Sequence, residues 1–384
     1  ILNETISESQ IGFEAVNFKA PQKDSASTST TKIFSDYRRE LEKFLNSLDN
    51  KEKIYFLINS NNKEVNRKFT KTLGVKVFHF DLFLLEAFYV NHHRRYKDFY
   101  PDASELVDLD DQEYLDKYFH INKQRKAFSL NGRFRSWRSA GIRALMESGI
   151  WEYPECDYSY LESRPNRLNL SFFDGPGDVN WRYLVDKIQL PKNLDLGDTE
   201  EMYLYNNNIQ RPTIDLIKNF KYRVVFESFL FTPQRIDEPQ FIPDSYSDSA
   251  LRSIIPGGFI TEKTYCGFVQ GHPSIILCDS ASREYLQNKG FYMFDEYMDY
   301  EAVDSIAFDY IIEDGTDLNV MQYQMAQNYA CQIGNIIKRD PNRTKNIREG
   351  VVKNFWMMRD PSVVLFPLYN LINRIWAAGQ RIKN

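Results

Sequence analysis

The hydrophobic positions of this chain form short buried runs separated by helical repeats, a pattern typical of an α/β protein. The first run is KIYFLI (residues 53–58), followed by a helical stretch to Leu73 and a second run, VKVFHF (residues 75–80). Strand, helix and strand in this order predict parallel strands in a Rossmann-like unit. No G-x-G-x-x-G follows the first run, so the dinucleotide-binding fingerprint is absent.

A second series of elements begins near residue 124. A longer irregular region covers residues 150–220, and a polar, proline-containing insertion covers residues 232–256. The pattern predicts strands at 127–130, 168–173, 222–226 and 274–277, and helices ending at Ser148 and spanning 33–48, 261–270, 281–289, 318–338, 345–358 and 367–382. It divides the chain into a flexible lead-in (1–30), an N-terminal Rossmann-like domain (31–123), a C-terminal domain (124–345) and C-terminal helices (346–384).

Composition narrows the class of protein further. The formal net charge is −5, so no global charge attracts nucleic acid or an anionic membrane. The four cysteines are widely spaced and form no C-x-x-C, which argues against a zinc site or a disulfide framework and favours a reducing compartment. No run of about 18 apolar residues is present, so we expect no membrane span. We expect a cytoplasmic protein, although the chain begins without methionine and a signal or anchor could precede it.

The tail from Lys338 onward is basic, with ten Lys or Arg residues against Asp340, Glu349 and Asp360. A basic amphipathic tail can lie on a membrane surface. The alternative, which we favour, is that the last helices dock back on the body of the protein.

The most suggestive stretch is GGFITEKTYCGFVQGHPSIIL, residues 257–277. Thr261, Glu262 and Lys263 open its predicted helix, where free backbone N–H groups and the helix dipole favour an anion. Lys263 adds a positive charge for a phosphate, and Glu262 can accept from sugar hydroxyls. The alternative is an ordinary helix cap with two solvated charges.

Two other segments carry candidate binding residues. The loop after the strand at 127–130 contains Asn131, Arg133, Arg135 and Arg138 at the start of a helix, an arrangement suited to phosphate oxygens. The alternative is a set of exposed loop arginines. The strand YRVVF, residues 222–226, delivers Glu227 to its carboxyl end, where ligands of open α/β sheets collect.

Three ordered segments, KAFSLNGRFRSWR, YRVVFES and GFITEKTYCGFVQGHPSIIL, resemble the donor-binding domain of the α-1,3-fucosyltransferase-like glycosyltransferases. The resemblance covers about residues 126–304. It implies the GT-B architecture, with two Rossmann-like domains facing across a cleft, the N-terminal one on the acceptor side. It also implies an inverting transfer from a nucleoside-diphosphate sugar, such as a GDP- or UDP-sugar, with no obligatory metal and no cofactor.

Carried over to this chain, the resemblance implies that Lys263 binds donor phosphate and that Glu262 binds the ribose hydroxyls. An arginine of the 133–138 loop would neutralise the diphosphate, and Glu227 would line the donor pocket. The chain departs from the family pattern at Ser228, where the family has Asn, and at Phe259, where it has Tyr. These departures leave the base and the sugar open.

An inverting transfer also requires a base that takes the acceptor's proton. The candidates are Asp81, Glu86 and Asp98, with the pair His92 and His93 as a further option, and no motif selects among them. An acidic segment at 108–111 has the D-x-D spacing of some metal-dependent sugar transferases. A solvated acidic turn is the alternative that we favour there.

The leading hypothesis is therefore a metal-independent, inverting glycosyltransferase that acts on a hydroxyl of a glycan or another macromolecule. A second hypothesis is a sugar transferase acting on hydroxylated bases of phage-type DNA, motivated by the arginine loop and the basic tail. A third is a non-catalytic module of the same fold that binds a nucleotide or a glycan.

Overall fold

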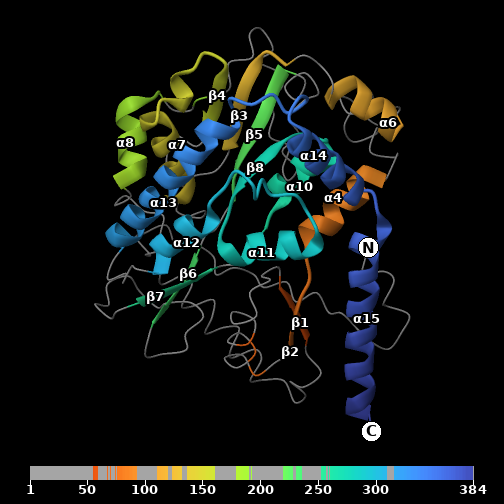
Figure 1. Ribbon diagram of the computed structural model, residues 1–384. Coiled ribbons are helices and arrows are strands. Elements are labelled where there is room, and N and C mark those ends of the chain that lie inside the picture. Colours follow the sequence, from red (N-terminus) through yellow and green to blue (C-terminus); the bar gives the residue numbers. More distant parts are fainter. Residues whose placement is uncertain are drawn as a thin grey trace.

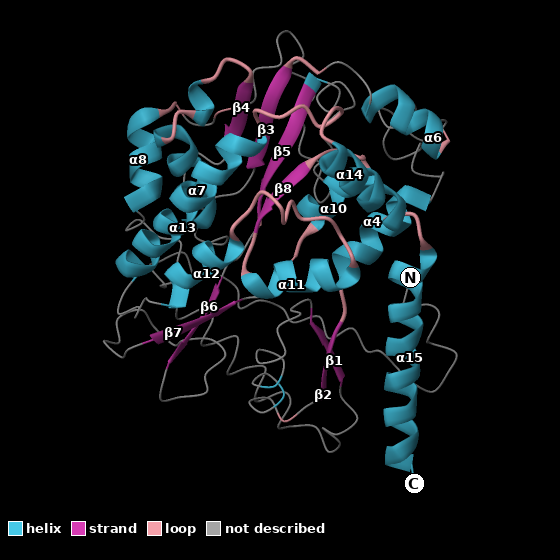
Figure 2. Ribbon diagram, in the orientation of Figure 1, coloured by secondary structure: helices cyan, strands magenta, loops and turns pink. Residues whose placement is uncertain are grey.

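The computed structural model of the chain describes residues 55–58, 76–92, 110–119, 123–131, 136–160, 179–189, 219–227, 231–235, 252–256, 260–308 and 315–383, and positions 67, 70, 74, 192 and 258. Within these residues it is an α/β protein built on a parallel four-stranded sheet (Figures 1 and 2). The predicted lead-in, the helix at 33–48 and the strand at 168–173 lie outside the described residues.

The central sheet has the strand order β4-β3-β5-β8, and all neighbouring strands are parallel. The strands are β3 (Arg125–Asn131), β4 (Cys156–Tyr160), β5 (Phe220–Phe226) and β8 (Ser274–Leu277). The chain passes from β3 to the edge strand β4 and then returns to the other side of β3 as β5. The direction of strand addition therefore reverses between β3 and β5, which makes this position a topological switch point.

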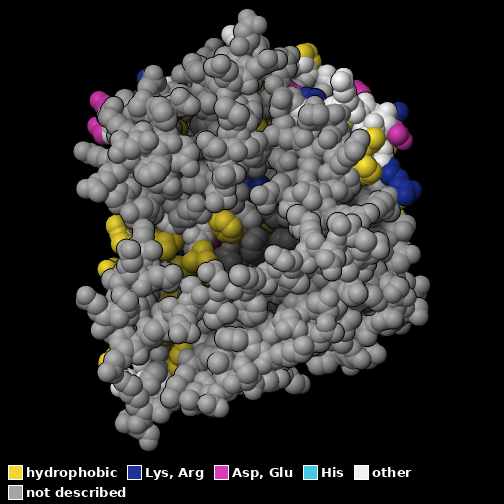
Figure 3. All heavy atoms as spheres, turned by 180° about the vertical axis from the view of Figure 1, so that it is seen from behind, with side chains coloured by type: hydrophobic (Ala, Val, Ile, Leu, Met, Phe, Trp, Pro, Cys, Tyr) yellow, Lys and Arg dark blue, Asp and Glu magenta, His cyan; other side chains and the backbone are white. Residues whose placement is uncertain are grey.

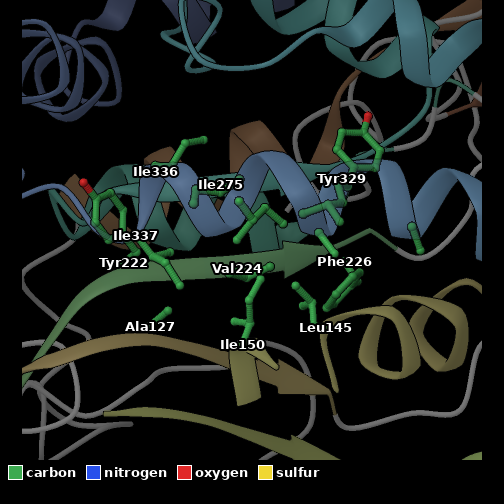
Figure 4. Close-up of a cluster of buried hydrophobic side chains, with 14 of the residues drawn as sticks. Ala127, Leu145, Ile150, Tyr222, Val224, Phe226, Ile275, Tyr329, Ile336 and Ile337 are labelled. Atoms are coloured by element: carbon green, nitrogen blue, oxygen red, sulfur yellow. The ribbon is translucent and has the colours of Figure 1, made fainter. Parts of the chain in front are cut away.

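Successive residues of the inner strands enter two different hydrophobic clusters, because side chains alternate between the faces of a sheet. Val224 and Phe226 of β5 belong to the larger cluster, whereas Val225 between them belongs to the smaller one. Figure 4 shows Val224 and Phe226 between helix α13 (Gly315–Ile336) and the side chains of Leu145 and Ile150. Both faces of the sheet are thus buried, which explains the nearly continuous apolar runs in the sequence.

Helices cover both faces (Figure 1). The larger cluster receives side chains from α13 and from α7 (Ser136–Glu147), α8 (Val179–Lys187) and α12 (Tyr300–Phe308). The smaller cluster receives side chains from α4 (Leu82–His92), α10 (Glu262–Val269), α11 (Ser280–Lys289) and α15 (Pro361–Lys383). Helix α14 (Lys345–Met357) contributes to the larger cluster and also contacts α10. From behind, hydrophobic side chains gather at the edge of a hollow near the middle of that face (Figure 3).

The prediction of two parallel N-terminal strands is confirmed by β1 (Tyr55–Ile58) and β2 (Lys76–His79), which pair in register from Tyr55 and Lys76. Strand β2 leads into α4, which packs on α10. The short helix α6 (Asp111–Tyr114) and the π-helical turn η4 (Leu115–Phe119) bury Tyr114, Leu115 and Phe119 in the larger cluster. This part of the predicted N-terminal domain therefore packs against the core of the four-stranded sheet.

Several elements differ from the sequence-based expectation. Strand β4 and helix α8 lie in the region interpreted as irregular, and the insertion at 232–256 contains most of an antiparallel pair, β6 (Phe231–Arg235) and β7 (Arg252–Pro256). Strand β4 was missed because Asp157 and Ser159 interrupt its apolar run. Both find polar partners, since Lys192 pairs with Asp157 and the backbone N–H of Asn131 donates to Ser159.

The last helix begins six residues earlier than predicted. Pro361 stands near its start, where the missing N–H costs nothing, and the Asp360 carboxylate accepts from the backbone N–H of Ser362 (2.8 Å). Pro367, which the pattern suggested as the start, lies inside the helix. The N-terminal half docks on the body through Val364 and Leu371, as the favoured interpretation of the tail expected. Among the described helices, none has both the length and the apolar character needed to cross a bilayer.

Candidate functional site

The candidate site lies at the carboxyl edge of the parallel sheet, on both sides of the switch point. Asn131 ends β3, and Glu227 directly follows β5. The next strand, β8, leads into Asp279. Because all four strands are parallel, these three polar residues belong to the same edge, where open α/β sheets bind their ligands.

Glu227 fixes the N-terminus of α10 to this edge. The side chain is fully buried, and its carboxylate accepts from the backbone N–H of Thr261 (3.2 Å), the Thr261 hydroxyl (2.7 Å) and the Thr264 hydroxyl (2.5 Å). These contacts give Glu227 a positioning role in the described structure. Its direct contact with a donor, which the family resemblance implies, stays a prediction.

The first turn of α10 has the geometry that the sequence predicted. Thr261 is the N-cap, with extended backbone angles (φ −116°, ψ 175°), and its hydroxyl accepts from the backbone N–H of Lys263 (3.4 Å). Lys263, in the first turn of the helix, is 8% exposed, so its side chain lies largely out of water. The side chain of Glu262 lies outside what the structure describes.

A second buried carboxylate, Asp279, was missed by the sequence analysis. It caps α11 by accepting from the backbone N–H (2.9 Å) and hydroxyl (2.9 Å) of Ser282, and it also accepts from the backbone N–H of Gly258 (3.2 Å). Burial raises the pKa of the Asp279 carboxyl to about 7, and the hydrogen bonds from Ser282 and Gly258 oppose the rise. The pattern Asp-Ser-Ala-Ser directly after a buried strand is a helix N-terminus signature that points to this residue.

Glu227 and Asp279 therefore hold the segment that precedes α10 at two points. Asp279 binds its beginning at Gly258, and Glu227 binds its end at Thr261. The anchors come from neighbouring strands, β5 and β8, whose register pairs Phe226 with Leu277. The orientation of the α10 N-terminus is thus set by the sheet.

Asn131 contributes a buried oxygen without a hydrogen-bond partner among the described residues. The side chain is 1% exposed, and its Nδ2 donates to the Ser129 hydroxyl (3.1 Å), but Oδ1 accepts no hydrogen bond there. Leaving such a group unsatisfied costs about 1–3 kcal/mol, so a buried orphan acceptor calls for an explanation. A ligand hydroxyl or N–H at the end of β3 would satisfy it.

The arginines of the 133–138 loop are described only in part. Arg138, in the first turn of α7, is buried, and its Nε donates to the carbonyl oxygen of Phe226 (3.4 Å). The guanidinium of Arg138 therefore lies at the end of β5, at the residue that precedes Glu227. Arg138 is thus not one of a set of exposed loop arginines. Arg133 and Arg135 lie outside the described residues, so their predicted role stays untested.

Of the base candidates, the structure describes only the Asp81 side chain. Asp81 follows β2, accepts from the backbone N–H of Leu84 (2.9 Å) and accepts a short hydrogen bond from the Tyr265 hydroxyl of α10. Burial raises the pKa of the Asp81 carboxyl to about 6, and the Tyr265 hydrogen bond opposes the rise. Glu86 and His92 lie in α4 with undescribed side chains, and Asp98 and His93 lie outside the described residues.

Asp81 also lines a cavity of about 250 Å³ between the end of β2, α11 and α15. Its polar lining includes His79, Tyr285, Lys289 and Arg374. Burial and the nearby Lys289 charge lower the pKa of His79 to about 4, so this imidazole is neutral at pH 7. The cavity is separate from the sheet-edge residues, and Tyr265 connects the two regions through its bond to Asp81.

The acidic segment at 108–111 gives no sign of metal binding in its described part. The Asp110 carboxylate accepts from the backbone N–H of Glu113 (2.8 Å), and the Glu113 carboxylate accepts from the backbone N–H of Asp110 (3.1 Å). This reciprocal pair is a capping box at the start of α6. Among the described residues, no group of three or more His, Cys, Asp or Glu side chains is placed to hold a metal ion.

No protein-family model matches this chain, and neither the curated proteins nor the solved structures include a significant match. What indicates the function of this chain is therefore the chemistry of its own residues. A helix N-terminus with a buried lysine lies at the carboxyl edge of the sheet, and a buried arginine and an orphan amide oxygen lie at the same edge. Such an arrangement is chemically suited to a phosphate-bearing ligand with hydroxyl groups.

Proposed function

We propose that this protein is an inverting glycosyltransferase of GT-B architecture. It takes a sugar from a nucleoside-diphosphate sugar and transfers it, without an obligatory metal, to a hydroxyl group of a glycan or another macromolecule. The observation that carries the proposal is the double anchoring of the α10 N-terminus, with Lys263 in its first turn, at the edge of the parallel sheet.

In this proposal the diphosphate lies against the first turn of α10. Backbone N–H groups of the first turn other than those of Thr261 and Lys263 donate to its oxygens, Lys263 supplies a positive charge, and the buried Arg138 adds a second. Because the diphosphate leaves with additional negative charge, fixed donors and cations at this position favour the transition state over the bound substrate. The Asn131 amide oxygen accepts from a hydroxyl or N–H group of the donor.

The transfer itself forms one bond and breaks one. The acceptor oxygen bonds to the anomeric carbon while the bond from that carbon to the diphosphate oxygen breaks, and a base takes the acceptor's proton. Asp81, Glu86 and Asp98 remain the candidates for that base. Both carboxylate oxygens of Asp81 already accept hydrogen bonds, so Asp81 must exchange one of them to take this part.

Saturation-transfer NMR and calorimetry with a panel of GDP- and UDP-sugars test the proposal. We expect one sugar nucleotide to bind and Lys263→Ala to weaken its binding about 10- to 100-fold, the value of a lost charge-assisted hydrogen bond. Lys353→Ala, at an exposed lysine of α14, is the control and should bind like the wild type. A wild-type protein that binds none of these donors contradicts the proposal, as does unchanged binding by Lys263→Ala.

A second assay separates an enzyme from a binding module of the same fold. Slow hydrolysis of the bound donor in the absence of acceptor requires that the bond to the diphosphate be activated. We expect the nucleoside diphosphate released by hydrolysis to accumulate with the wild type and not with Lys263→Ala. Donor binding without any hydrolysis or transfer would favour the module.

A further inference from the structure

Helix α15 carries a row of exposed apolar side chains along one face. The exposed fractions are 61% for Phe366, 60% for Tyr369, 43% for Ile372 and 59% for Trp376. Their spacing of three, three and four residues places all four on one side of a helix. We call these residues the α15 stripe.

The stripe is not the face by which α15 docks on the protein. Val364 and Leu371 of the same helix are buried, and Val364 belongs to the smaller hydrophobic cluster together with Leu84 and Phe88 of α4. These docked residues set the rotation of the helix about its axis and leave the stripe in solvent. In Figure 1 the last turns of α15 lie well beyond α4 and α14. The body of the protein therefore buries one apolar face of this helix and leaves a second apolar face exposed.

The charges of the helix indicate what covers the stripe. Residues 361–383 contain Arg374, Arg381 and Lys383 and no acidic residue. Arg374 lies over the Phe78 ring and lines the Asp81 cavity, so Arg381 and Lys383 are the basic residues of this helix beyond its docked part. The chain as a whole has a net charge of −5, so this helix is positively charged in a chain that is negatively charged overall. A basic helix with an exposed aromatic stripe complements an anionic lipid surface, because aromatic rings favour the headgroup region and lysine and arginine pair with lipid phosphates.

We infer that α15 binds the surface of an anionic bilayer, with the α15 stripe inserted between the headgroups and the basic C-terminal residues Arg381 and Lys383 at the phosphates. A second copy of the chain is a poorer occupant, because two such helices would bring like charges together. The stripe is also rich in Tyr, Trp and Phe, whereas Leu and Ile dominate the seams of paired helices. The binding is peripheral and goes beyond the proposed reaction, since it uses none of the residues at the sheet edge.

Flotation of the full chain with lipid vesicles tests this inference. We expect the protein to float with vesicles of mixed phosphatidylcholine and phosphatidylglycerol and not with vesicles of phosphatidylcholine alone. Tyr369→Ser combined with Trp376→Ser should reduce the partition coefficient roughly tenfold or more, because two large rings no longer leave water. Raising the salt concentration should weaken binding of the wild type, because the lipid charges are then screened.

The matched control removes two exposed apolar side chains elsewhere, by Val185→Ser on α8 combined with Val320→Ser on α13. It should float like the wild type, and both double variants should keep the wild-type melting temperature, since all four positions are exposed. Failure of the wild type to float with the anionic vesicles overturns the inference, as does equal flotation of the two double variants. A dimer in sedimentation that Tyr369→Ser with Trp376→Ser dissolves also overturns it and assigns the stripe to a second copy.

Discussion

The three hydrogen bonds that Glu227 accepts predict how much this side chain contributes to the free energy of unfolding. Glu227→Ala leaves the Thr261 N–H and the Thr261 and Thr264 hydroxyls without their buried acceptor. At about 1.5 kcal/mol or more for each hydrogen bond to a charged group, the free energy of unfolding should fall by about 5 kcal/mol. This is a large share of the total stability of an ordinary domain, so the alanine variant is expected to fold poorly.

Milder substitutions allow the contribution of individual hydrogen bonds to Glu227 to be measured. Thr264→Val keeps the shape of the side chain and removes one donor, so it should cost about 1–2 kcal/mol. Glu227→Gln keeps one acceptor oxygen and turns an N–H₂ group toward donors, so it should cost about 2 kcal/mol. Because the two groups share one hydrogen bond, the double variant should cost less than the two single variants together.

Urea unfolding at pH 7, followed by tryptophan fluorescence and circular dichroism, measures these values. A change in the midpoint at constant slope reports stability alone. Strictly additive single and double variants would refute the hydrogen bond between Glu227 and Thr264, and so would unchanged midpoints. If Glu227 only positions α10, folded Glu227→Gln should also lose less sugar-nucleotide affinity than Lys263→Ala.

Two further predictions concern the same architecture. The Asp279 carboxyl has a folded pKa of about 7, above its ordinary value of 3.8, so its stabilising contribution is complete below about pH 4 and is lost as pH rises through 7. Between pH 4 and pH 8 the wild type should therefore lose up to about 4 kcal/mol relative to Asp279→Asn, and parallel pH–stability curves from urea titrations would contradict this. A Cβ added at Gly141 would lie 2.0 Å from the Phe226 ring, so Gly141→Ala should destabilise the packing of α7 on β5 by about 1–3 kcal/mol or more. Gly334→Ala, where the nearest atom is 3.8 Å away, should instead stabilise α13 by about 0.5–1 kcal/mol, and thermal melts that rank the two variants in the opposite order would contradict the packing.

The success of the sequence-based predictions follows the strength of the local signal. Strand β8 matches the predicted 274–277, and the predicted helix at 281–289 differs from α11 by one residue. Helix α11 also has explicit ends in the sequence, with Asp279 as its N-cap and Gly290 in the left-handed conformation (φ 95°) as its C-cap. Buried apolar runs and caps are local features, so they can be recognised without the fold.

The errors occur at residues whose contacts come from segments far away in the sequence. The polar residues of β4 interrupt the apolar pattern by which a buried strand is recognised. They can be buried because Lys192 and Asn131, from elsewhere in the chain, are their partners. Arg138 was grouped with loop residues, yet its position in α7 buries it against the end of β5.

The sequence by itself determined the α/β class, the positions of the buried strands and the chemical character of the segment around Thr261 and Lys263. These follow from periodicity, capping preferences and side-chain chemistry, which act over a few residues. Only the tertiary structure decided that the strands add in the order β4-β3-β5-β8, and that Glu227 and Asp279 anchor one loop from neighbouring strands. Strand order and long-range hydrogen bonds depend on which segments, dozens of residues apart, are packed together, and no local pattern encodes that choice.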